Sequence, residues 1–215
     1  MSTSAIVSHD PLAAAAPGLR GRRRARWLDR ALLPIAALLS VGALLLPWWS
    51  LTMHAPQYPD GLTVTTGLLA VTGDVNEVDG LNHYIGFMKL AAFATFEREL
   101  APWGEAAIIV LLMVAAGGRP AWTRWLALPA VVLPAFFIGD LAGWLYYAGH
   151  HLDPHAPLSS SVMPWTPHLI GSGGVGQFTT IGSLISGFWC ALGAALLSAI
   201  AIVRLGRTEG ESPRR

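Results

Sequence analysis

The chain has 215 residues, of which 53% are apolar and 13% are charged. Soluble domains carry about a quarter of their residues charged, so this low share, together with long apolar runs, indicates a membrane protein. The formal net charge of +1 excludes no class of partner. The single cysteine, Cys190, excludes an internal disulfide and a Cys-x-x-Cys motif, and we interpret it as a small buried apolar residue.

Residues 1–30 are predicted to be a disordered, basic cytoplasmic tail, because they are small and polar and end in the cluster Arg20 to Arg26. Such a cluster can bind nucleic acid. An apolar run follows at once, so we interpret the cluster as a membrane orientation signal and expect no nucleic-acid partner. Residues 31–49 are predicted to be the first transmembrane helix. It is expected to stay uncleaved, since no small-x-small site follows and Trp48-Trp49 suits an interfacial anchor.

Residues 50–103 form the first long polar segment. Leu62–Thr66 and Leu68–Thr72 are β-prone runs separated by Gly67, which predicts a small hairpin. Residues 84–100 are predicted to be a helix that lies along the membrane surface and ends at Pro102.

The remainder alternates between apolar and polar segments. We expect a second span over residues 104–118, a turn at 119–121, a third span at 122–147, a second loop at 148–177, a fourth span at 178–203 and a tail at 204–215. Gly182, Gly187 and Gly193 predict close helix packing of the fourth span. The predicted fold class is an all-α integral membrane protein with four transmembrane helices and two ordered extracytoplasmic loops.

The positive charges determine the predicted orientation. Twelve arginines lie before the first predicted span, around the turn between the second and third spans, or after the fourth span. They are Arg20, Arg22, Arg23, Arg24, Arg26, Arg30, Arg119, Arg124, Arg204, Arg207, Arg214 and Arg215. The two long loops hold only Lys89 and Arg98. Because positive charge stays on the cytoplasmic side, both termini are predicted to be cytoplasmic and both loops extracytoplasmic. The expected location is a bacterial inner (plasma) membrane, with the lipid bilayer as the first partner.

Histidine and methionine are concentrated in the two loops. Six of the seven histidines lie there: His54, His83, His150, His151, His155 and His168. Met53, Met88 and Met163 lie there too. Imidazole and thioether together suit copper, so copper is the one expected cofactor. The alternative is that these histidines are solvated or cap turns.

Asp140 lies about seven residues, or roughly 10 Å, below the outer end of the third predicted span. A carboxylate at such a depth is a functional candidate, with a hydrogen bond to a neighbouring span as the structural alternative. Glu105, at the outer mouth of the second span, is predicted to be interfacial.

Two motifs fail on inspection, and a third kind of site is not found. Residues 74–80 resemble a calcium loop, but glycine falls at position 7 and Ile85 at position 12, so we reject an EF-hand. The glycine-rich residues 171–176 lack the Gly-Lys-Ser/Thr ending of a phosphate-binding loop and are interpreted as a re-entry into the membrane. We find no nucleophile with a partnered base, so no enzyme activity is predicted.

Residues 53–62 and 73–86 resemble a largely uncharacterised family of small bacterial membrane proteins, and Leu81-Asn82-His83-Tyr84-Ile85-Gly86 is the most specific piece. Residues 151–157 and 167–171 resemble that family's later loop. Members are encoded near genes for copper handling and nitrous oxide reductase maturation. The resemblance therefore implies a copper-related role, and it favours ligands in the first loop over His150, His155 and His168.

From these patterns we expect a membrane accessory protein that binds copper transiently outside the cell, for delivery to or maturation of a cuproenzyme. The expected ligands are His83, Met88, His54 and Met53, with Asn82 and Asp79 orienting His83. One alternative is a metal-free scaffold that docks other membrane subunits through Tyr58, Tyr84 and Trp165. Another is a small proton-coupled transporter that uses Asp140.

Overall fold

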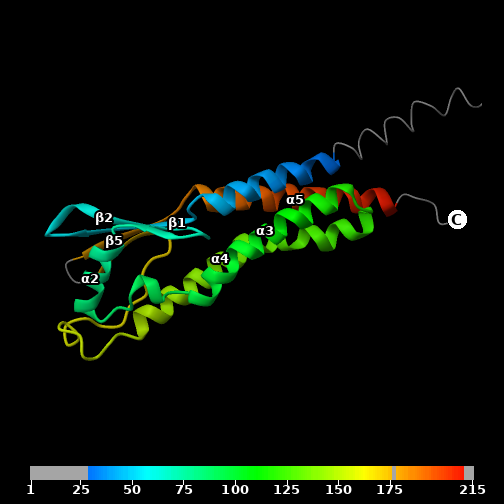
Figure 1. The fold of residues 1–215 in the computed structure, drawn as a ribbon. Coiled ribbons are helices and arrows are strands. Elements are labelled where there is room, and N and C mark those ends of the chain that lie inside the picture. Colours follow the sequence, from blue (N-terminus) through cyan, green and yellow to red (C-terminus); the bar gives the residue numbers. More distant parts are fainter. Residues whose placement is uncertain (1–28, 176–177, 211–215) are drawn as a thin grey trace, which may run out of the picture.

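The computed structural model describes residues 29–175 and 178–210. The predicted disordered tail before residue 29, with its arginine cluster, and the chain end after residue 210 lie outside the described residues. A helical bundle forms one end of the described molecule and a sheet with one helix forms the other (Figure 1). The elements are a helix of residues 29–45, β1 (Trp49–Ala55), β2 (Tyr58–Thr66), β3 (Val71–Gly73), α2 (Val75–Ile85), η1 (Leu90–Ala92), α3 (Thr95–Gly117), α4 (Pro120–His150), β4 (Gly171–Val175), β5 (Phe178–Leu184) and α5 (Ser186–Gly210).

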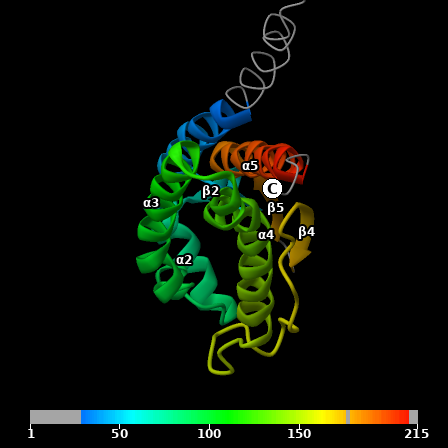
Figure 2. The ribbon, with the colours of Figure 1, turned by 90° about the vertical axis from the view of Figure 1, so that its right-hand side faces the viewer.

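The bundle consists of the helix of residues 29–45 with α3, α4 and α5, seen side by side in Figure 2. Its core is formed by leucines and alanines from all four helices, among them Leu33, Leu112, Ala127 and Ala194. A Cβ on Gly187 would clash with the carbonyl oxygen of Leu46, so only glycine fits where α5 meets the end of the first helix. This contact agrees with the close packing expected of the predicted fourth span.

Three helices in the described part of the chain are long and apolar enough to cross a membrane: Thr95–Gly117, Ala121–His150 and Ser186–Gly206. They correspond to the second, third and fourth predicted spans. The helix of residues 29–45 packs with them, but its described part is shorter than the roughly 18 residues expected of a span. Three of the four predicted spans are therefore confirmed as helices of sufficient length and apolar character to cross a membrane.

The region between the sheet and the bundle differs from the prediction. The helix expected over residues 84–100 is wrong: α2 ends at Ile85, because Gly86 adopts a left-handed conformation with φ 76° that stops it. The chain then forms the short turn η1, and α3 begins at Thr95. Pro102 lies inside α3 and does not end a helix there.

The sheet is the largest departure from the predicted all-α class, which is wrong in this respect. Five antiparallel strands pair in the order β3-β2-β1-β5-β4. The expected hairpin exists as the pairing of β2 with β3, but β1 also pairs with β5, which lies entirely within the predicted fourth span. Residues 178–184 are thus a strand, and α5 begins only at Ser186.

Candidate functional site

One face of the sheet, which we call the inner face, carries the apolar side chains. Side chains alternate between the two faces of a strand, so Trp49, Leu51 and Met53 of β1 point to the same side. Their partners Thr66, Val64 and Leu62 on β2 do so too. On the opposite, outer face the hydroxyls of Thr52 and Thr63 hydrogen-bond at 3.1 Å, and those of Thr65 and Thr72 at 2.9 Å.

The half of the inner face farther from the bundle is closely packed. Met53 and Leu62 are buried there against Val78 of α2. Only a small space of about 40 Å³ remains between the sheet and α2. We call this region the covered half.

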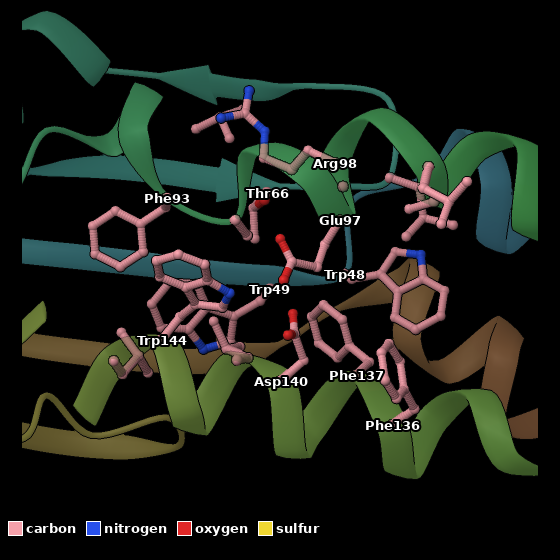
Figure 3. A pocket seen from close by; sticks show the side chains of 18 of the residues that line it. Trp48, Trp49, Thr66, Phe93, Glu97, Arg98, Phe136, Phe137, Asp140 and Trp144 are labelled. Carbon is pink, nitrogen blue, oxygen red and sulfur yellow. The ribbon is translucent and has the colours of Figure 1, made fainter. Parts of the chain in front are cut away.

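The half nearer the bundle lies over a pocket of about 380 Å³, which we call the pocket. The strands supply Trp49, Leu51 and Val64 to one wall, while α3 and α4 supply the other (Figure 3). The segment around Phe87 and Leu90 borders both the pocket and the small space under α2, so it separates the two halves. The pocket has the size typical of sites for small ligands.

Aromatic rings surround the middle of the pocket. They are Trp48, Trp49, Phe93, Phe136, Phe137 and Trp144. Trp48 is fully buried, and its ring centroid lies 4.8 Å from that of Phe137, while the centroids of Phe93 and Trp144 lie 6.1 Å apart. These contacts hold the rings in place from β1, α4 and the turn before α3, and give the pocket a preformed apolar wall.

Four charged side chains also line the pocket: Glu97, Arg98 and Glu105 from α3, and Asp140 from α4. The carboxylates of Glu97 and Asp140 lie close together among the rings, near enough for their charges to repel (Figure 3). Within residues 29–175 and 178–210 none of the four forms an ion pair. The third carboxylate, that of Glu105, is eight residues along α3 and so about 12 Å deeper toward the bundle.

Glu105 is buried, with 2% of its surface exposed, and neither carboxylate oxygen has a partner at hydrogen-bond distance in the described structure. The buried hydroxyl of Ser40, on the helix of residues 29–45, is the polar group that lies near it. Glu105 therefore lies buried between helices and is not exposed at the protein surface. An unpartnered buried carboxyl group is costly, which marks it as a candidate for contact with a ligand.

The predicted copper ligands are spread over different surfaces. Met53 is buried on the inner face of the sheet, whereas His54, the next residue of the same strand, points to the outer face and lies over Gly61. His83 is exposed on α2, with its ring against Tyr84, and Val78 and Asn82 occupy the buried side of that helix. The described arrangement thus does not gather Met53, His54 and His83 around one ion.

The two residues expected to orient His83 bind backbone groups. The carboxylate of Asp79 accepts a hydrogen bond of 2.7 Å from the backbone N–H of Leu90, and the side-chain amide of Asn82 donates to the carbonyl of Met88 at 3.4 Å. They therefore fix residues 88–90 against α2. Met88 is brought close to α2 through its backbone and lies half-buried.

The second loop shows no convergence of its histidines. His150 and His151 stack on Tyr146 and Tyr147, at centroid distances of 4.1 and 4.0 Å. No group of three His, Cys, Asp or Glu side chains within the described ranges is arranged to hold a metal ion. Copper binding remains a prediction from the sequence.

The residues expected to dock a partner differ in exposure. Tyr84 is 54% exposed, and Tyr58 is half-buried. The ring of Trp165 packs at 5.3 Å from that of Phe87. Comparison of the chain with protein-family models, with curated proteins and with solved structures found no match.

Proposed function

We propose that the protein is a membrane accessory protein that binds one long-chain amphiphile in the pocket beneath its sheet. The observation that supports this proposal is the pocket itself, which combines apolar walls with two helices long enough to span a membrane. An apolar cavity beside such helices is filled favourably by a hydrocarbon chain, because the chain removes apolar surface from water. The surrounding lipid is the nearest source of such a chain.

The distribution of charge supports an orientation in which the sheet lies outside the cell. Arg30 donates a hydrogen bond of 2.9 Å to the carbonyl of Gly118, and Arg204 pairs with Asp29 at 3.2 Å. These contacts lie at the end of the bundle opposite the sheet (Figure 1). Because positive residues favour the cytoplasmic side, this end faces the cytoplasm and the pocket lies at the level of the outer leaflet.

A reporter inserted at Ala70 tests this orientation. Ala70 is exposed between β2 and β3, so an insertion there leaves the strand pairs intact. The proposal, with the helix of residues 29–45 as a fourth span of a bacterial inner membrane, expects a periplasmic alkaline phosphatase reporter to be active and a cytoplasmic fluorescent reporter to be dark. The reverse result would place the pocket on the cytoplasmic side of the membrane. It would contradict the proposal that the ligand comes from the outer leaflet.

Filling the pocket tests the binding function directly. Gly104 lines the pocket, and a Cβ there would meet no atom within 4 Å, so Gly104→Leu adds bulk to the pocket without a backbone clash. The full-length protein is purified in lipid nanodiscs, and native mass spectrometry compares the mass retained by the wild type and by the variant. We expect the wild type to retain one amphiphile and Gly104→Leu to lose most of it.

The matched control is Gly139→Leu. Gly139 is also an exposed helical glycine with nothing within 4 Å of a Cβ, but it does not border the pocket. This variant should retain the same bound mass as the wild type. A wild type without any bound small molecule, or equal retention in both variants, would contradict the proposal, as would a retained mass that belongs to a polypeptide.

A further inference from the structure

We infer that the amphiphile bound in the pocket carries an ammonium group, which lies between Glu97 and Asp140 among the aromatic rings. This inference rests on the proposed function, since it names the chemistry of the ligand that the same pocket takes. Its physical basis is the combination of carboxylates, rings and one unpartnered buried carboxyl group in a cavity whose walls are otherwise apolar.

The charges of the pocket favour a cation. The carboxylates of Glu97 and Asp140 lie near each other on facing helices (Figure 3). The guanidinium of Arg98 and the buried carboxyl group of Glu105 also line the pocket. Two like charges in apolar surroundings repel strongly, and a positive group placed between them relieves that repulsion and forms charge-assisted hydrogen bonds to both. Arg98 is the one cation on the wall and forms no ion pair with them in the described part of the chain.

The rings favour an ammonium group over a hydrated metal ion. Trp49 and Phe137 lie on either side of the Glu97–Asp140 pair, with Trp144 beside them (Figure 3). The faces of aromatic rings attract organic cations, most strongly where water is excluded, and recognition of ammonium ligands commonly uses such rings. A hydrocarbon tail attached to the ammonium group then occupies the remaining apolar volume of the pocket.

Glu105 is a further polar group at the deep end of the same pocket, about 12 Å from the Glu97–Asp140 pair. Its side chain is buried and its two oxygens have no hydrogen-bond partner among the described residues, yet it borders the same pocket. Buried polar groups are nearly always satisfied, so a carboxyl group without a partner at a cavity wall points to a partner that the cavity holds at its deep end.

Competition between amphiphiles of equal chain length tests the inference. A photoreactive fatty-acyl lipid is cross-linked to the full-length protein in nanodiscs, and hexadecylammonium, hexadecan-1-ol or hexadecanoate is added at equal mole fraction in the membrane. We expect the ammonium compound to suppress cross-linking at a mole fraction at least about tenfold lower than the alcohol does. Asp140→Asn and Glu97→Gln should each reduce this preference several-fold while leaving competition by the alcohol unchanged.

Glu99→Gln is the matched control. Glu99 is an exposed carboxylate on the same helix and does not line the pocket, so its loss should not change the preference. Equal competition by the ammonium compound and the alcohol, or stronger competition by hexadecanoate, would overturn the inference while leaving the proposed binding function intact. If none of the three competes, the proposed function fails as well. Since Glu97 and Asp140 are partly exposed, isosteric amides there are compatible with folding, which circular dichroism checks.

Discussion

The inner face of the sheet has two parts, the covered half and the half over the pocket, which we call the open half. They belong to the same strands but have different neighbours. Met53 lies under α2 with almost no free space, whereas Leu51, two residues earlier on β1, borders a pocket of about 380 Å³. The strands supply apolar residues to both halves, so the difference comes from the helices. The short helix α2 packs Val78 against the sheet, while the span-length helices α3 and α4 leave a space between themselves and the sheet. Figure 1 shows the three helices on the same side of the sheet. The covered half thus stabilises the fold, and the open half is free to bind.

The largest expected effect comes from removing side chains on the two halves. Met53→Ala removes a buried side chain from a closely packed region, and we expect it to lower the free energy of unfolding by about 2–4 kcal/mol. Leu51→Ala enlarges a space that already exists, so its cost should be about 1 kcal/mol or less. Equilibrium unfolding in mixed detergent micelles measures both values. Equal losses would show that the two halves are packed alike.

A smaller effect is expected at the boundary between the halves. Asp79→Ala removes the acceptor for the backbone N–H of Leu90, in the segment that separates the pocket from the space under α2. Because this hydrogen bond is lost, we expect the free energy of unfolding to fall by about 1–2 kcal/mol. Glu77→Ala, at an exposed position on the same helix, should change the stability by less than about 0.5 kcal/mol. The same unfolding titration applies. Indistinguishable variants would mean that Asp79 does not hold this boundary.

The wall of the open half contains one strained residue. Ala94, just before α3, has φ 44° and ψ 45°, a left-handed conformation that a Cβ disfavours. Ala94→Gly should therefore raise the free energy of unfolding by about 0.5–1 kcal/mol. Ala106→Gly, inside α3, should lower it by a similar amount. A loss of stability in Ala94→Gly would contradict the strained conformation.

The smallest effects are expected from histidines that belong to neither half. His54→Ala and His83→Ala should each change the stability by less than about 0.5 kcal/mol, because His54 lies on the outer face and His83 is exposed. The same variants test the copper prediction, with Cu(I) titrated against a competing chelator. If the wild type binds Cu(I) stoichiometrically and each variant loses that binding, the two histidines share a copper site. That result would support the copper prediction and contradict the separation of His54 and His83 in the fold.

The sequence predicts the helical part better than the sheet. Long apolar runs identify α3, α4 and α5 because a span leaves a strong local signal. The pairing of β1 with β5 joins segments more than a hundred residues apart, and no local pattern encodes it. Trp49–Ala55 does alternate between apolar and polar residues, but its first residue was assigned to a span and the rest to a loop.

The candidate site was predicted only in part. Asp140 stood out because a carboxylate within an apolar run is rare, and the structure does place it on the pocket. Glu97 and Glu105 were missed, since the first resembled a surface residue and the second an interfacial one. Only the packing of α3 against the sheet and the first helix shows that both border the same cavity.

Mapping where a membrane lipid touches the protein tests the central claim most directly. A lipid with a photoreactive group near the end of its acyl chain is cross-linked to the full-length protein in nanodiscs, and the modified peptides are sequenced. Our account predicts adducts on Leu51 and Leu90 inside the pocket, and their loss in Gly104→Leu but not in Gly139→Leu. Adducts confined to outward-facing side chains such as Trp125 and Val132, with none in the pocket, would contradict it.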